Sequence, residues 1–107
     1  MKDKSESGKK QNKIQEVQII EQNLQNLLLQ KQAFQMEISE TKAAKKEIEK
    51  SEDIFKIIGQ LMIKTDKEKT MEELMNKEKI LDLRMKSIEK QEASLIERSE
   101  NLKKDIF

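Results

Sequence analysis

The sequence predicts a mainly α-helical protein, a long antiparallel coiled-coil helical hairpin with a single central β-hairpin. Three observations lead to this fold class. The composition is 40% charged and 35% apolar, with three Phe and no Trp, Tyr or Pro, which is typical of long helices. Apolar residues recur at alternating spacings of three and four on both sides of the middle. Between these regions, SEDIFKIIGQLMIKT is almost continuously apolar around one glycine.

The first expected helix covers residues 11–50. Residues 1–10, MKDKSESGKK, have no apolar period, and we expect them to form a mobile tail. From Gln11 onward the apolar residues follow a heptad seam: Val17, Ile20, Leu24, Leu27, Phe34, Ile38 and Ile48. Polar residues hold the remaining seam positions: Lys31, Thr41 and Lys45. A period that persists over about five heptads predicts a coiled coil and argues against disorder.

The second expected helix covers residues 66–106. It follows Thr65-Asp66-Lys67-Glu68, which has the T-x-x-E form of a capping box. In that motif the Thr and Glu side chains satisfy backbone N–H groups that lack partners in the first turn. The seam of this helix again alternates three and four: Met71, Leu74, Glu78, Leu81, Met85, Ile88, Glu92, Leu95, Ser99, Leu102 and Ile106. We interpret residues 11–107 as one domain.

The central segment predicts a β-hairpin over residues 53–65, with its turn at Gly59 and Gln60. Glycine adopts positive φ at little steric cost, as a two-residue Gly-X turn requires. Such a turn makes the flanking helices antiparallel, so that residues equally far from it share a layer. Leu24 and Leu95 obey this rule, as do nine further pairs of seam residues. Because the turn and the seams are independent features, their agreement supports the fold.

Lys31 and Glu92 lie in neighbouring layers of this coiled coil. Their charged groups could approach each other while the lysine stem covers apolar surface. Alternatively, both side chains extend into water, and this is the arrangement that we slightly favour. In either case a polar seam residue costs stability and can fix the register of the helices.

Both faces of the predicted hairpin are apolar near the turn. A two-stranded ribbon is marginally stable alone and has two unpaired edges. We therefore expect hairpins of several chains to combine into a shared β-structure. The expected assembly residues are Ile54, Phe55, Ile57, Ile58, Gly59, Leu61, Met62 and Ile63. The alternative is a hairpin that folds down onto its own helices.

No motif in the sequence points to catalysis. There is no His, no Cys and no Gly-rich phosphate loop, so we expect neither enzymatic activity nor a cofactor or metal site. The 22 basic and 21 acidic side chains are interspersed, which argues against nucleic-acid binding. No apolar run reaches the roughly 18 residues of a membrane span. The lack of Cys fits a reducing compartment, and we expect a cytoplasmic location.

Three strings carry a resemblance to a known family. KIIGQLMIKTDKEKTMEEL, with LLLQKQAFQMEISETKAAKKEIEK before it and LRMKSIEKQEASLIE after it, resembles the β-type subunit of archaeal prefoldin. The most specific part is the order of apolar strand, Gly, apolar strand and K-T before a charged helix start. Prefoldin α-type subunits carry a second hairpin between the helices, for which this chain has no room.

The resemblance implies a hexamer of two α-type and four β-type subunits, with a double β-barrel of hairpins and six projecting coiled coils. It further implies an ATP-independent chaperone that holds non-native proteins and passes them to a group II chaperonin. Client binding would then occur at the coiled-coil tips: Ile14, Val17, Ile19, Ile20, Leu102, Ile106 and Phe107. Alternatively, the terminal Ile and Phe side chains close the last layers. A structural or an RNA-binding coiled coil is the alternative function.

Overall fold

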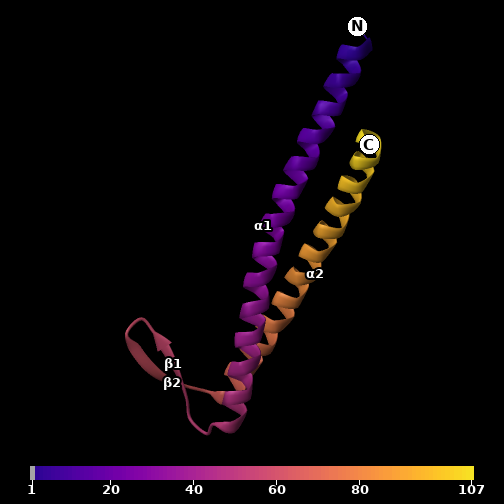
Figure 1. The fold of residues 1–107 in the computed structure, drawn as a ribbon. Helices are drawn as coiled ribbons and strands as arrows, with labels where there is room; N and C mark the ends of the chain where they lie inside the picture. The colour runs from indigo at the N-terminus through magenta and orange to yellow at the C-terminus, as the bar shows by residue number, and fades with distance from the viewer. Residues whose placement is uncertain (1) are drawn as a thin grey trace. The chain divides into compact units, whose positions relative to one another are not determined.

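Two long helices are joined by a two-stranded sheet that lies between them in the sequence (Figure 1). The computed structural model describes the backbone of residues 2–107 and the side chains of residues 8–107. The elements follow in the order α1 (Lys2–Lys50), β1 (Ile54–Ile58), β2 (Leu61–Thr65) and α2 (Lys67–Ile106). This order confirms the predicted fold class.

Helix α1 begins at Lys2, earlier than the boundary expected at Gln11. The segment before Gln11 lacks an apolar period, but its Lys and Glu residues have good helix propensity, so the backbone helix continues through it. Met1 and the side chains of residues 2–7, which belong to the expected tail, lie outside the described residues. The mobility of residues 1–10 stays a prediction.

The predicted seam is confirmed by the burial of its side chains. The chain divides into two compact units, one of Met1–Gln32 with Lys86–Phe107 and one of Ala33–Met85. In both units every seam residue named above is buried or half-buried. The most buried of them are Val17, Ile20, Leu27, Ile88 and Ser99 in the first unit, and Thr41 and Leu81 in the second.

Ion pairs between the helices establish the antiparallel direction. In the first unit, the Lys13 ammonium lies 3.3 Å from the Asp105 carboxylate, and the Lys31 ammonium lies 3.3 Å from the Glu92 carboxylate. Residue numbers therefore rise along α1 as they fall along α2. In the second unit, the hairpin joins the two helices directly.

The contact between Lys31 and Glu92 corrects one expectation. We favoured the arrangement in which both side chains extend into water, and that is wrong. The ammonium of Lys31 donates to Glu92 Oε1, and the two side chains are only 27% and 19% exposed. Since a half-buried charge without a partner is costly, two opposite charges within reach of each other pair across the seam.

The β-hairpin has the predicted turn and register. Ile58 pairs with Leu61 next to the turn, and the antiparallel pairing continues outward to Ile54 opposite Thr65. Gly59 has a φ of 61°, whereas no described non-glycine residue has positive φ. This combination is that of a type II′ turn, whose twist matches the twist of paired strands.

The start of α2 differs from the expected capping box. Thr65 is the last residue of β2 and pairs with Ile54, so Asp66 takes the N-cap position. Asp66 Oδ1 accepts a hydrogen bond from the Glu68 backbone N–H at 3.2 Å. At the end of α1, the Lys67 ammonium donates to the Glu49 carbonyl at 3.1 Å and so satisfies one of its terminal carbonyls.

Replacing Gly59 by Ala should loosen the hairpin. Nothing lies within 4 Å of a Cβ built at this position, so the cost comes from the positive φ alone. That cost is about 1–2 kcal/mol for an L-residue. Hydrogen exchange of the amides in β1 and β2 should accelerate in Gly59→Ala. Gly59→Asn is the matched control, because Asn tolerates this conformation, and it should retain more protection. Equal protection in both variants would contradict the role assigned to the turn.

Reversing the charges of Lys31 and Glu92 should show that they pair. Lys31→Glu and Glu92→Lys should each lower the free energy of unfolding, because each places like charges together in the seam. The double variant should recover a coupling energy between about 0.5 and 3 kcal/mol. Urea unfolding followed by circular dichroism measures all four chains of this cycle. Additive losses would mean that the two charges do not interact.

Candidate functional site

The hairpin exposes apolar side chains on both of its faces. The register places Phe55, Ile57 and Met62 on one face and Ile58, Leu61 and Ile63 on the other. All six are exposed, from 45% for Ile63 to 71% for Ile57. The alternative that the hairpin folds down onto its own helices is therefore wrong. Such a concentration of exposed apolar groups is characteristic of an interaction surface.

Charged side chains are confined to the base of the hairpin. The Lys64 ammonium lies 3.2 Å from the Asp53 carboxylate, and the Lys56 ammonium lies 3.8 Å from the Glu73 carboxylate on α2. From Ile57 to Ile63 no residue is charged. The part next to the turn is thus free of charged side chains, whose desolvation would oppose burial most strongly.

The backbone of the hairpin is also open to association. The sheet has only two strands in the described part of the chain, so each strand has one edge without a strand partner. Figure 1 shows the strands as a ribbon that leaves the helix ends of the same unit. Unpaired strand edges present backbone donors and acceptors to any further strand. The hairpin therefore offers apolar side chains and hydrogen-bonding edges together.

The residues expected at the coiled-coil tip differ in exposure. Val17 and Ile20 are 8% and 4% exposed and belong to the buried seam. Leu102 and Ile106 are half-buried. Ile14, Ile19 and Phe107 are exposed, and Phe107 almost completely so. The set therefore contains residues that close the last layers and residues that can meet another molecule without any rearrangement.

Three ion pairs join the helices around these tip residues. Lys13 pairs with Asp105, Glu16 pairs with Arg98, and Lys103 lies 3.6 Å from Glu21. Their side chains are mostly exposed, so each contributes little stability. They surround the apolar tip with charges of both signs.

Several exposed apolar residues were not predicted. They lie on the helices but outside the seam: Leu28, Leu29, Met36, Met75, Ile80, Leu83 and Ile96. Apolar residues at heptad positions outside the seam are the sequence signal that identifies them. Single exposed apolar residues are common on protein surfaces, so these positions alone do not define a site.

The described residues contain no group of three or more His, Cys, Asp and Glu side chains placed to hold a metal ion. Within the same part of the chain, neither helix is apolar enough over a sufficient length to cross a membrane.

Comparisons with known proteins agree with this arrangement. The family model described as prefoldin subunit matches residues 11–106. The prefoldin subunit beta of Thermococcus onnurineus is 43% identical over 89 residues, which are 80% of this chain and 77% of that subunit. The prefoldin subunit beta of Methanosarcina acetivorans is 36% identical over 99 residues, which are 90% and 85% of the two chains.

A solved structure extends the similarity to the fold. The crystal structure of the prefoldin beta subunit from Thermococcus strain KS-1 matches with a TM-score of 0.84 and 34% sequence identity. The match covers 92% of this chain and 89% of the other. With its helices, its single hairpin and its sequence all matching, the chain belongs to the prefoldin family as a β-type subunit.

Proposed function

We propose that this chain acts as an ATP-independent holdase subunit within a prefoldin hexamer of two α-type and four β-type subunits. Its hairpin joins the hub of the hexamer, and its coiled-coil tip binds non-native proteins. The assembly then delivers these clients to a group II chaperonin in the cytoplasm.

The exposed hairpin is the single observation that carries this proposal. Six large apolar side chains remain exposed on a ribbon that has two open edges. Burying the rest of their surface would contribute on the order of 5–10 kcal/mol before the costs of association. A gain of this size supports stable assembly, and the neighbouring ribbons are supplied by an α-type subunit and further copies of this chain.

The tip supports client binding by its chemistry. Exposed Ile14, Ile19 and Phe107 offer apolar contacts that do not depend on one client sequence. The charges around them keep the tip hydrated when no client is bound. Such a surface suits weak binding of the apolar segments that unfolded proteins expose. The only two glycines stand singly, so no Gly-rich loop for a nucleotide phosphate is present.

Placing a charge on the hairpin should prevent assembly without unfolding the helices. Ile57 is 71% exposed, so Ile57→Lys removes little packing within the chain but would bury a charge in the hub. The matched control is Leu83→Lys on α2, because Leu83 is 66% exposed. Sedimentation of each variant mixed with an α-type subunit should give a hexamer for Leu83→Lys only. A hexamer with Ile57→Lys would count against the hairpin as the assembly element.

Polar substitutions at the tip should weaken client holding and leave assembly intact. Ile19→Ser with Phe107→Ser removes exposed apolar groups, and the ion pairs of Lys103 and Asp105 remain in place. Leu29→Ser is the matched control, because Leu29 is 64% exposed and lies outside the tip set. Light scattering of an aggregating test protein should show weaker suppression by the tip variant only, at equal hexamer concentration. Full suppression by that variant would exclude these side chains as client contacts.

A further inference from the structure

Two Lys–Glu pairs lie within the seam and join α1 to α2. Lys31 Nζ is 3.3 Å from Glu92 Oε1 in one unit, and Lys45 Nζ is 3.1 Å from Glu78 Oε2 in the other. All four side chains are at most 27% exposed. Both lysines come from α1 and both glutamates from α2. We propose that these two pairs select α2 as the helix that binds α1, and that they fix the register of the two helices.

The spacing of the pairs excludes a shift by one heptad. Lys31 and Lys45 are two heptads apart on α1, and Glu78 and Glu92 are two heptads apart on α2. The seam position midway between the charged ones is apolar on each helix, Ile38 and Met85. A shift by one heptad in either direction would therefore separate all four charges from their partners. A shift by two heptads would restore at most one pair.

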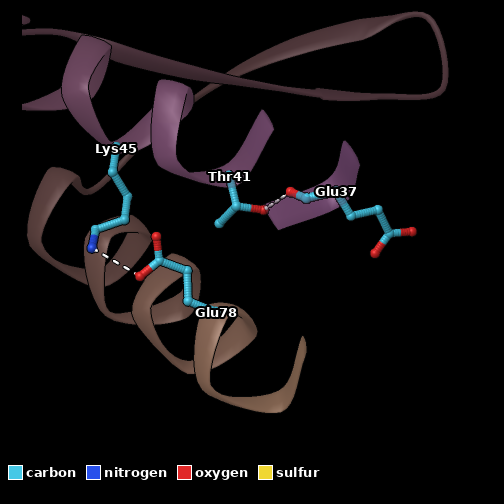
Figure 2. A network of polar contacts seen from close by, with 4 residues as sticks. All are labelled: Glu37, Thr41, Lys45 and Glu78. Atoms are coloured by element: carbon cyan, nitrogen blue, oxygen red, sulfur yellow. Dashed lines mark hydrogen bonds and ion pairs between the residues drawn. The ribbon is translucent and has the colours of Figure 1, made fainter. Parts of the chain in front are cut away.

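The surroundings of Glu78 indicate that its pair does not maximise stability. Figure 2 shows Glu78 on α2 reaching toward Lys45 on α1, with Thr41 one turn away on α1. The buried Thr41 hydroxyl does not donate to Glu78, because it donates to the Glu37 carbonyl of its own helix at 2.7 Å. Glu78 Oε1 is buried and has no hydrogen-bond partner in the described part of the chain. Since an unsatisfied buried oxygen costs free energy, an apolar pair at this position would be more stable. The charges therefore contribute specificity for the partner helix and its register.

The same charges oppose the pairing of like helices. Two copies of α1 in parallel register would bring Lys31 against Lys31 and Lys45 against Lys45. Two copies of α2 would bring the glutamates together in the same way. Like charges within a seam are a recognised means of excluding wrong coiled-coil partners. The α1 seam thus fits a helix that presents acidic residues two heptads apart, as α2 does.

The hairpin alone does not fix this register in a free subunit. A two-stranded sheet is marginally stable, and its exposed strands lose few contacts when they separate. Residues released from the strands would then lengthen the connection enough to allow a one-heptad shift of either helix. The seam pairs oppose that shift before any assembly of hairpins takes place.

Engineered disulfides can report the register, because the chain contains no Cys of its own. The reporter of the native register carries Leu24→Cys with Leu95→Cys, which lie equally far from the turn. Two reporters of a one-heptad shift carry Leu24→Cys with either Ile88→Cys or Leu102→Cys. The single variant Leu24→Cys reports parallel α1 dimers as a crosslinked dimer.

Each reporter is placed in four otherwise full-length chains. The first has the native seam, and the second has an inverted seam with Lys31→Glu, Lys45→Glu, Glu78→Lys and Glu92→Lys. The third has an apolar seam with Lys31→Ile, Lys45→Ile, Glu78→Leu and Glu92→Leu. The fourth is a control that removes only the exposed pair through Glu21→Gln and Lys103→Gln. Crosslinks are quantified on non-reducing gels after mild oxidation.

The native, inverted and control chains should crosslink in the native register at least about tenfold more than in either shifted register, because a shift leaves half-buried charges unpaired. The apolar chain should melt at a higher temperature. Its ratio of native to shifted crosslinks should nevertheless fall towards one, and its Leu24→Cys variant should form crosslinked dimers. If the apolar chain keeps the native ratio and gives no dimers, the seam charges do not select partner or register. If the ratio of native to shifted crosslinks falls in the control chain as well, the effect is not specific to the seam charges.

Discussion

Burial of one seam between α1 and α2 is the interaction on which the rest of the structure depends. The chain is strongly charged, and its buried side chains lie almost entirely on the seam. The seam brings distant parts of the sequence together, for example Lys13 with Asp105. It also holds together the end of α1 and the start of α2, which β1 and β2 connect. Without this burial, neither the hairpin nor the tip would have a defined support.

The apolar residues fall into two groups, those covered by the chain itself and those left exposed. Seam residues such as Leu81 are covered within the chain, whereas hairpin residues such as Ile57 are exposed although they are equally apolar. A chain that gained nothing from exposing Ile57 would be expected to carry a polar residue there. The contrast supports an assembly role for the hairpin more directly than composition does. An assembly role also accounts for an apolar hairpin in a subunit whose own core is too small to cover it.

Much of the fold could be predicted because its determinants are local or periodic. The heptads identified the seam, and Gly59 identified the turn and therefore the strand register. The N-cap was misplaced because Thr65 is held by its strand partner Ile54, a tertiary effect that a capping motif does not reveal. The pairing of Lys31 with Glu92 depended on the reach of two flexible side chains, which spacing alone does not settle. The tip set was drawn from helix position, so it combined the seam residue Val17, which is buried, with Ile19, which lies outside the seam and is exposed.

The open edges of the hairpin also bear on how assembly can stop. A ribbon with two free edges can accept a neighbour on each side, and the neighbour again presents a free edge, as in a growing fibril. Addition ends without a free edge when the sheet curls until its first and last strands meet. The type II′ turn at Gly59 favours the right-handed twist that produces such curling, and the five-residue strands leave little length for flat stacking. The same glycine that makes the bend thus favours closed rings over open-ended polymers.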